Sequence, residues 1–179
     1  MSGDGAAALN EHTVRQLFDS VINDRDFAVA DEICADDCQL HVPGLSLPRG
    51  PEALKQFAGQ LVSGFPDLEV EIDEVIATPD AASVRWHSIR QTQTGEYRGI
   101  PPTGRSVSVT GTNFYRLEAG RITEAWVQAD SLGLAQQLGV VPTDDAGAGA
   151  RVRFILGSLV RMGYLQARHS LGGRKRRRA

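Results

Sequence analysis

The sequence predicts an α+β fold in which three N-terminal helices pack on an antiparallel sheet. The first observation is a stripe over residues 11–23, where apolar side chains recur at helical spacing. The second is residues 106–117, in which alternate positions are apolar, as in a half-buried strand. The third is the turn Glu118-Ala119-Gly120-Arg121, after which residues 122–128 return as a second strand. Helices therefore come first and a hairpin comes last.

The first half of the chain supplies the three helices. We expect a flexible start over residues 1–10 and a first helix over 11–23, with Phe18 among its inward-facing residues. A short helix over 27–35 precedes a strand over 39–42. The third helix begins near Pro51, because proline suits the first helical turn. Its inner face is formed by Leu54, Phe57, Ala58 and Leu61.

Two further strands are predicted before the hairpin. Residues 67–72 alternate acidic and aliphatic side chains, so one face is buried and the other is a solvated row of carboxylates. That row has no companion histidine to complete a coordination sphere, and we expect no metal there. Residues 82–91 form the next strand, and the proline-containing loop 95–104 is expected at the rim of a pocket.

The strand over residues 82–91 carries large polar side chains whose direction the sequence leaves open. Trp86 shares a face with Val84, whereas Arg85 and His87 point to the opposite face. If Arg85 and His87 point inward, they are the strongest polar pair of a cavity. If they point outward, they belong to the surface or to a subunit interface.

Composition limits the class of protein. With 179 residues, of which 41% are hydrophobic, the chain can form one well-buried domain, which we place at residues 11–142. No apolar run approaches the roughly 20 residues that span a bilayer, and the N-terminus lacks signal-peptide features, so we expect a cytoplasmic protein. Cys34 and Cys38 have no second cysteine pair to complete a zinc site, and we expect two free thiols.

Charge is divided unevenly between the body and the C-terminal segment. All 22 acidic residues but only 10 of the 19 basic residues precede residue 151, so residues 1–150 carry a formal charge of −12. This balance argues against nucleic-acid binding by the domain. Residues 143–150 have the composition of a linker, and residues 151–179 carry 9 basic residues and no acidic one. We expect a basic amphipathic helix with a cationic tail, which either packs on the protein or contacts an anionic partner or membrane surface.

Two segments carry a family resemblance. Residues 94–111, TGEYRGIPPTGRSVSVTG, contain G-x-P-P-T-G, and residues 124–139, EAWVQADSLGLAQQLG, contain W-x-x-x-D-x-x-G-L-x-x-Q-L-G. Together they resemble the SnoaL-like polyketide cyclases of the nuclear-transport-factor-two-like superfamily. The resemblance implies a cone-shaped, curved antiparallel sheet around a cavity and a homodimer formed through the outer face of the sheet.

The resemblance also bears on the chemistry. The aromatic polyketide cyclases of the family use a His on the first hairpin strand and an Asp on the second, and the matching positions here are Asn113 and Val127. Valine cannot transfer a proton, and asparagine can only orient or polarise a carbonyl. The family's strand register pairs Asn113 with Val127 on the inner face and leaves Trp126 and Gln128 outside; a slip of one residue would reverse this.

The remaining ionisable candidates for catalysis are Asp130, His41 and His87, which lie on or beside predicted cavity strands. Each also has a purely structural interpretation. Asp130 precedes a helix that Gly139 is suited to end, and is a typical N-cap; His41 could bond a backbone carbonyl; and His87 could lie on the surface. We expect substrate contacts from Asn113, Tyr115, Val127, Trp86, Arg85, Phe18 and Phe57.

Two classes of function stay open at this point. The first is a cofactor-independent acid–base enzyme, of cyclase, isomerase or epoxide-opening type, that acts on a hydrophobic polyketide-like molecule. The second is a non-catalytic binding or partner protein that retains the pocket. The sequence contains no phosphate-binding loop and no G-x-G-x-x-G after a strand, so we expect no nucleotide or flavin cofactor.

Overall fold

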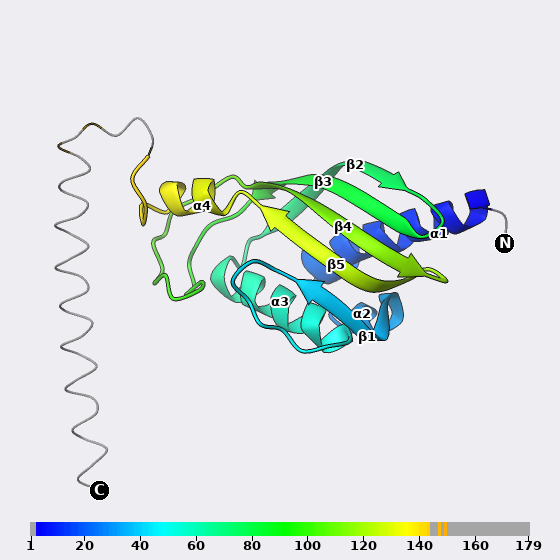
Figure 1. The fold of residues 1–179 in the computed structure, drawn as a ribbon. Helices are drawn as coiled ribbons and strands as arrows, with labels where there is room; N and C mark the ends of the chain where they lie inside the picture. The colour runs from blue at the N-terminus through cyan, green and yellow to red at the C-terminus, as the bar shows by residue number, and fades with distance from the viewer. Residues whose placement is uncertain (1–2, 144–146, 148, 150–179) are drawn as a thin grey trace, which may run out of the picture. The chain divides into compact units, whose positions relative to one another are not determined.

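The computed structural model describes residues 3–143, 147 and 149. The chain divides into one compact unit that ends at Leu138 and a second that begins at Gly139. The predicted segments 143–150 and 151–179 lie outside the described residues, except for Thr143, Gly147 and Gly149. In chain order the elements are α1 Gly3–Gln16, η1 Leu17–Asn23, α2 Val29–Ile33, β1 Cys34–His41, α3 Pro51–Gly64, β2 Glu69–Ala77, β3 Ala81–Arg90, β4 Thr110–Glu118, β5 Arg121–Ala129 and α4 Ser131–Gln137 (Figure 1).

The five strands form one curled sheet in the order β1-β5-β4-β3-β2, which confirms the predicted α+β fold. Neighbours from β2 to β5 are antiparallel, but β1 runs parallel to β5. A parallel pair requires a long connection, and here that connection contains α3 and the other three strands. No helix among the described residues has both the length and the apolar character needed to cross a membrane.

The first helix begins earlier than predicted. α1 starts at Gly3, so residues 3–10, which we expected to be flexible, are helical. Its glycine- and alanine-rich start lacks the apolar stripe that marks a helix in a sequence. Two buried side chains attach it to the sheet: Asn10 Nδ2 donates to the carbonyl of Thr78 (2.9 Å), and Thr13 Oγ1 donates to the carbonyl of Gly120 (2.7 Å).

The end of the first helix is wound more widely than an α-helix. Residues Leu17–Asn23 form the π-helical segment η1, and the amide of Asp24 donates to the carbonyl of Asp19, five residues earlier (2.9 Å). Such segments are rare and often occur at functional sites. Asn23 then bonds both backbone groups of Val70 on β2, since its Nδ2 donates to the carbonyl and its Oδ1 accepts from the amide, each at 2.9 Å.

The second helix and first strand differ from the predicted boundaries. α2 spans only Val29–Ile33, and β1 begins at Cys34 rather than at residue 39. The pairing of β1 with β5 is interrupted between Cys34 and Gln39, which explains why the intervening residues lack strand periodicity. Cys34 and Cys38 are both buried and both free, as predicted.

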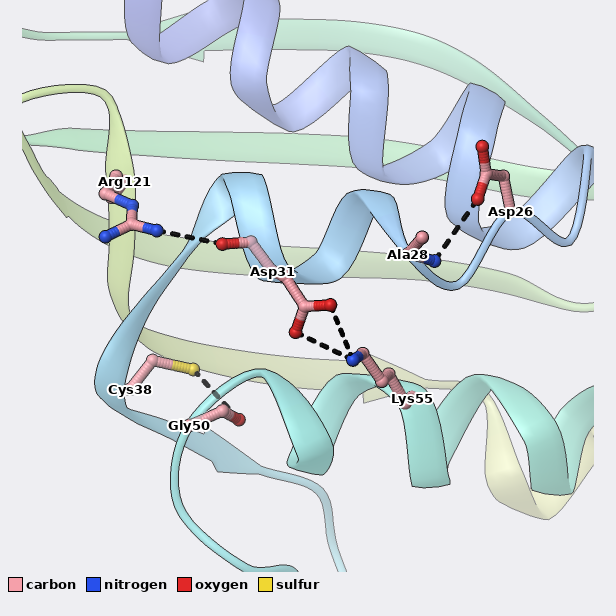
Figure 2. A network of polar contacts seen from close by, with 7 residues as sticks. All are labelled: Asp26, Ala28, Asp31, Cys38, Gly50, Lys55 and Arg121. Atoms are coloured by element: carbon pink, nitrogen blue, oxygen red, sulfur yellow. Dashed lines mark hydrogen bonds and ion pairs between the residues drawn. The ribbon is translucent and has the colours of Figure 1, made fainter.

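A polar network holds α2, α3 and the sheet together (Figure 2). Lys55 Nζ on α3 contacts both carboxylate oxygens of Asp31 at 2.7 and 2.8 Å, and Arg121 Nη2 on β5 donates to the Asp31 carbonyl at 2.8 Å. The Cys38 thiol donates to the carbonyl of Gly50, the residue before α3, at 3.7 Å. These contacts fix the helical layer against β1 and β5.

The final hairpin has the predicted register. Asn113 pairs with Val127, and Phe114 pairs with Trp126. Ala119 and Gly120 both have positive φ, of 50° and 79°, as a two-residue hairpin turn of the primed type requires. β4 starts at Thr110, four residues later than predicted. The preceding residues form an isolated bridge at Ser106, and the amide of Val107 donates to the carbonyl of Gln91. The alternation therefore places Asn113, Tyr115 and Val127 on the buried face.

Candidate functional site

A cavity of about 230 Å³ lies between the inner face of the sheet and the helices. Its wall is mainly aliphatic and aromatic, and η1, α3, the sheet and the loop before β4 all contribute to it. Arg98 is its one charged lining residue among the described part of the chain. The lining residues are Leu17, Phe18, Ile22, Leu40, Val42, Pro43, Leu54, Phe57, Leu61, Leu68, Val70, Trp86, Gln91, Tyr97, Arg98, Ile100, Val109, Asn113, Tyr115, Val127, Ala129, Ser131, Leu134 and Ala135.

A hydrogen-bond relay crosses the cavity wall from Trp86 through Asn113 to Tyr115. Trp86 Nε1 lies 3.2 Å from Asn113 Oδ1, and Asn113 Nδ2 lies 2.8 Å from Tyr115 Oη. An indole N–H can only donate, so the amide oxygen of Asn113 must accept from it and the amide nitrogen must face Tyr115. The oxygen of Tyr115 is then an acceptor in the relay, and its own hydrogen is left for a further acceptor.

Burial keeps the end of this relay uncharged. Tyr115 is 1% exposed. The loss of solvation raises the pKa of its phenol well above the usual range, and the hydrogen bond from Asn113 opposes this only in part. At neutral pH Tyr115 is therefore a neutral hydrogen-bond donor rather than a base. Such a donor can polarise a carbonyl or bind a hydroxyl.

Gly111, which has no side chain, leaves the space that the Trp86 ring occupies. Gly111 pairs with Trp86 across β3 and β4. A Cβ built on Gly111 would lie 2.3 Å from the Trp86 ring and 2.5 Å from the carbonyl oxygen of Gln128. No side chain fits there, so the indole can lie against the strand and reach Asn113. The ring of Phe18, on η1, approaches it from the helical side with centroids 6.4 Å apart.

Most of the expected substrate contacts lie on this cavity. Of the seven residues proposed from the sequence, six line it: Asn113, Tyr115, Val127, Trp86, Phe18 and Phe57. The seventh, Arg85, does not. The loop over residues 95–104, expected at the rim, contributes Tyr97, Arg98 and Ile100.

The expected histidine candidates lie on the other side of the sheet, and their assignment to the cavity is wrong. Leu40 and Val42 line the cavity, so the intervening His41 faces outward. Its ring stacks on Trp126 with centroids 5.2 Å apart, and its Nε2 lies 2.8 Å from Glu124 Oε1.

Arg85 and His87 also face outward, because Val84, Trp86 and Ser88 take the inner positions of β3. Both contact the same carboxylate: Arg85 Nη1 lies 2.8 Å from Asp73 Oδ2, and His87 Nδ1 lies 2.9 Å from Asp73 Oδ1. The sequence left two orientations open for this pair, and the structure selects the outer one.

Asp130 is a helix cap. Its Oδ1 accepts from the amide of Gly133 at 2.8 Å at the start of α4. Its neighbours Ala129 and Ser131 line the cavity, but Asp130 itself does not. The three expected proton-transfer residues are therefore not brought together by the fold. No Asp, Glu or His is found among the described residues that line the cavity.

Several lining residues were not named individually as substrate contacts from the sequence, and Gln91 and Arg98 are the most polar of them. Arg98 has a positive φ of 51°, and its guanidinium donates to the carbonyl of Pro43, so it links the loop before β4 to the loop after β1. Gln91 directly follows β3. A period-two continuation of the inner face from Trp86 and Ser88 would have pointed to residue 90, and the irregular end of the strand shifts this position by one residue.

Comparison with known proteins agrees with this architecture. The SnoaL-like polyketide cyclase family model matches residues 12–138. No curated protein sequence matches the chain.

Solved structures with this fold come from several bacteria. A protein from Jannaschia sp. CCS1 described as a SnoaL-like polyketide cyclase shares 26% identity and a TM-score of 0.68, over 76% of this chain and 95% of that one. TsrD from Streptomyces laurentii shares 27% identity and a TM-score of 0.64, over 73% and 97%. IdmH from Streptomyces antibioticus, described as a polyketide cyclase, shares 29% identity and a TM-score of 0.62, over 73% of this chain and 98% of that one. Because the family model covers the whole sheet and well over half of the chain, the chain belongs to the SnoaL-like polyketide cyclase family.

Proposed function

We propose that this protein binds a largely apolar, polyketide-like small molecule in the cavity and promotes its cyclisation or isomerisation without an ionised base of its own. The observation that carries the proposal is the relay that ends at the hydroxyl of Tyr115 inside an apolar wall. A ligand carbonyl that accepts from this hydroxyl gains stabilisation as negative charge develops on its oxygen. The apolar wall strengthens that interaction by lowering the local dielectric.

In this proposal the protein supplies positioning and electrophilic assistance. Folding a flexible substrate so that two of its carbons approach each other converts an improbable encounter into a favoured one. Tyr115 polarises the carbonyl that is attacked. The proton lost from the attacking carbon passes to water or to another oxygen of the substrate, because the described lining contains no carboxylate or imidazole. The reaction is a rearrangement with no net oxidation, so it requires no redox cofactor.

A second candidate function is supported by the same lack of a carboxylate or imidazole in the described lining of the cavity. A protein that keeps the cavity and the donor at Tyr115, but catalyses nothing, would act as a carrier or sensor of the same class of molecule. The two functions share binding and differ in turnover.

Binding can be followed through the tryptophans. The chain has 2 tryptophans, and Trp86 lines the cavity whereas Trp126 lies on the outer face. In a Trp126→Phe variant, ligand binding should change the emission of Trp86 alone. The probes are linear poly-β-ketones and hydroxyquinones, titrated into the full chain, with product formation measured by mass spectrometry.

The Tyr115→Phe variant then separates the two functions. An enzyme that uses this donor should lose about 10²- to 10³-fold in turnover, as when one oxyanion donor is removed. His87→Ala, on the outer face, serves as the control and should keep full turnover. Binding of the probes without any conversion would favour the carrier, and equal turnover by wild type and Tyr115→Phe would refute the role of Tyr115.

We also propose a homodimer formed through the outer sheet face. Phe114 on β4 is 39% exposed and lies beside Trp126, with ring centroids 5.7 Å apart. Arg116 lies over the Phe114 ring at 5.2 Å, and His41 stacks on Trp126. Aromatic and arginine side chains are enriched in interfaces, so this outer aromatic patch of Phe114, Trp126, Arg116 and His41 favours a second copy as its partner.

A further inference from the structure

Gln91 is a largely buried polar residue whose side-chain amide has no hydrogen-bond partner among the described residues. It is 6% exposed and lines the cavity, and its backbone carbonyl accepts from the amide of Val107 (2.9 Å). Among the described residues, no protein group hydrogen-bonds its side-chain amide. The amide thus presents both an N–H donor and a carbonyl acceptor to the cavity.

Gln93, two residues later, differs from Gln91 because its side-chain amide is fully bonded to the protein. It is 0% exposed, and its Nε2 donates to the carbonyls of Ile100 and Pro101 at 3.1 and 3.3 Å. Its Oε1 accepts from Thr103 Oγ1 at 2.7 Å. Gln93 therefore holds the loop before β4 in shape. The other buried polar side chains that the structure describes are bonded as well: Asn10, Thr13, Ser88 and Asn113.

Among the described residues, no fully buried side-chain nitrogen or oxygen lacks a hydrogen-bond partner, so the unbonded amide of Gln91 is open to the cavity and not sealed in the core. Leucine at the same position would complete the apolar wall. An amide that opens into an apolar cavity and is bonded by no described protein group is free to bond a polar group of a ligand there.

The position of Gln91 bears on the shape of that ligand. Tyr115, Asn113 and Gly111 lie opposite Ala82, Val84 and Trp86 on β3, which orders them along the strand. Gln91 lies five residues beyond Trp86, which corresponds to at most about 16 Å along the chain at ~3.3 Å per residue. The donor at Tyr115 and the amide of Gln91 are thus near opposite ends of the cavity wall formed by β3 and β4.

We propose that Gln91 is a second ligand contact that determines specificity, and that the substrate is an elongated apolar molecule with a polar group at each end. One end carries the carbonyl or hydroxyl that meets Tyr115. The other carries a hydroxyl or carbonyl that meets the Gln91 amide. This inference rests on the proposed function, since it assigns the second end of the same ligand.

The test uses matched hydroxyanthraquinones that carry either one terminal hydroxyl or two hydroxyls at opposite ends. Affinities for the full chain are measured by titration calorimetry. Wild type should bind the compound with two hydroxyls about three- to tenfold more tightly, as one neutral hydrogen bond provides. Gln91→Leu should bring that ratio to about one while keeping the affinity for the compound with one hydroxyl.

Thermal unfolding separates a ligand contact from a structural residue. Gln91→Leu should unfold at the same temperature as wild type or higher, whereas Gln93→Leu should unfold at a clearly lower one. A large loss of stability in Gln91→Leu and in the unbranched variant Gln91→Met, or an affinity ratio that stays unchanged, would overturn the inference.

Tyr115→Phe distinguishes this inference from the proposed function. It should weaken both compounds and keep the ratio between them. If it weakens neither while Gln91→Leu abolishes the ratio, the role of Tyr115 fails and the Gln91 contact stands. If neither compound, nor any poly-β-ketone probe, binds the wild-type chain, the proposed function fails and this inference fails with it.

Discussion

The two faces of the hairpin formed by β4 and β5 use the same backbone for opposite purposes. The inner face carries Asn113, Tyr115 and Val127, and its polar groups are neutral and bonded to one another. The outer face carries Phe114 and Trp126 among charged side chains. The side chains of His41, on β1, and His87, on β3, also lie on the outer face of the sheet. Ionisable residues near a predicted cavity are therefore a poor guide to its chemistry when strand alternation has not been settled.

The largest difference in stability between inner-face and outer-face variants is expected for substitution of Asn113. Asn113→Leu leaves the indole N–H of Trp86 and the hydroxyl of Tyr115 without their partner inside the fold. We expect a loss of about 3 kcal/mol in the free energy of unfolding, measured by urea denaturation. Thr112→Val, on the outer side of the same strand, should change it by less than about 0.5 kcal/mol. Equal effects at both positions would contradict the comparison.

A somewhat smaller loss of stability is expected for substitution of Gly111. Gly111→Ala forces a Cβ against the Trp86 ring and should cost about 2 kcal/mol, as overpacking does. It should also shift the emission of Trp86. The matched control is Gly59→Ala in α3, where no atom lies within 4 Å of the added Cβ. That change should stabilise the protein by about 0.5–1 kcal/mol. A stable Gly111→Ala protein with unchanged emission would rule out the proposed packing.

Alkaline pH should reveal the burial of Tyr115. Its folded pKa is raised, so above the unfolded pKa of about 10 the unfolded chain releases a proton that the folded chain retains. Stability is then complete below about pH 10 and falls by about 1.4 kcal/mol per pH unit above it, for this one residue. Unfolding of Tyr115→Phe, followed by denaturant titrations at rising pH, should show a shallower decline. Tyr97, whose pKa burial also raises, remains in both proteins and contributes equally.

The smallest effect on the unfolding of a single chain is expected on the outer face. Trp126→Glu should alter that free energy little, yet it should weaken the proposed dimer at least about tenfold, because it places a charge in the interface. Sedimentation over a range of concentrations measures this. Leu132→Glu, at an exposed apolar position of α4, is the control and should leave association unchanged. A monomeric wild type would contradict the proposal.

Sequence periodicity predicted the fold better than the site. The register of Asn113 with Val127, the start of α3 at Pro51 and the free cysteines all followed from local patterns. The start of α1 at Gly3 was not predictable, because its anchors, Asn10 and Thr13, bond residues far away in the sequence.

The site was harder to predict because alternation gives two faces without saying which is inside. Leu40 and Val42 already implied that His41 faces outward, and that signal was present in the sequence. Gln91 had no such signal, since its place depends on an irregularity after β3 and on a missing partner. A missing hydrogen bond can only be recognised once all the neighbours are placed.

Asn23 has a consequence for how copies of this protein can meet. β2 is an edge strand, and exposed edge strands tend to recruit further strands from other chains. The side chain of Asn23 occupies both outward-facing backbone groups of Val70, as a neighbouring strand would. A second chain could extend the sheet past this point only by displacing the amide. Continuous sheet growth, the route to fibrils, is thereby opposed at this edge by one side chain at the end of a π-helical segment.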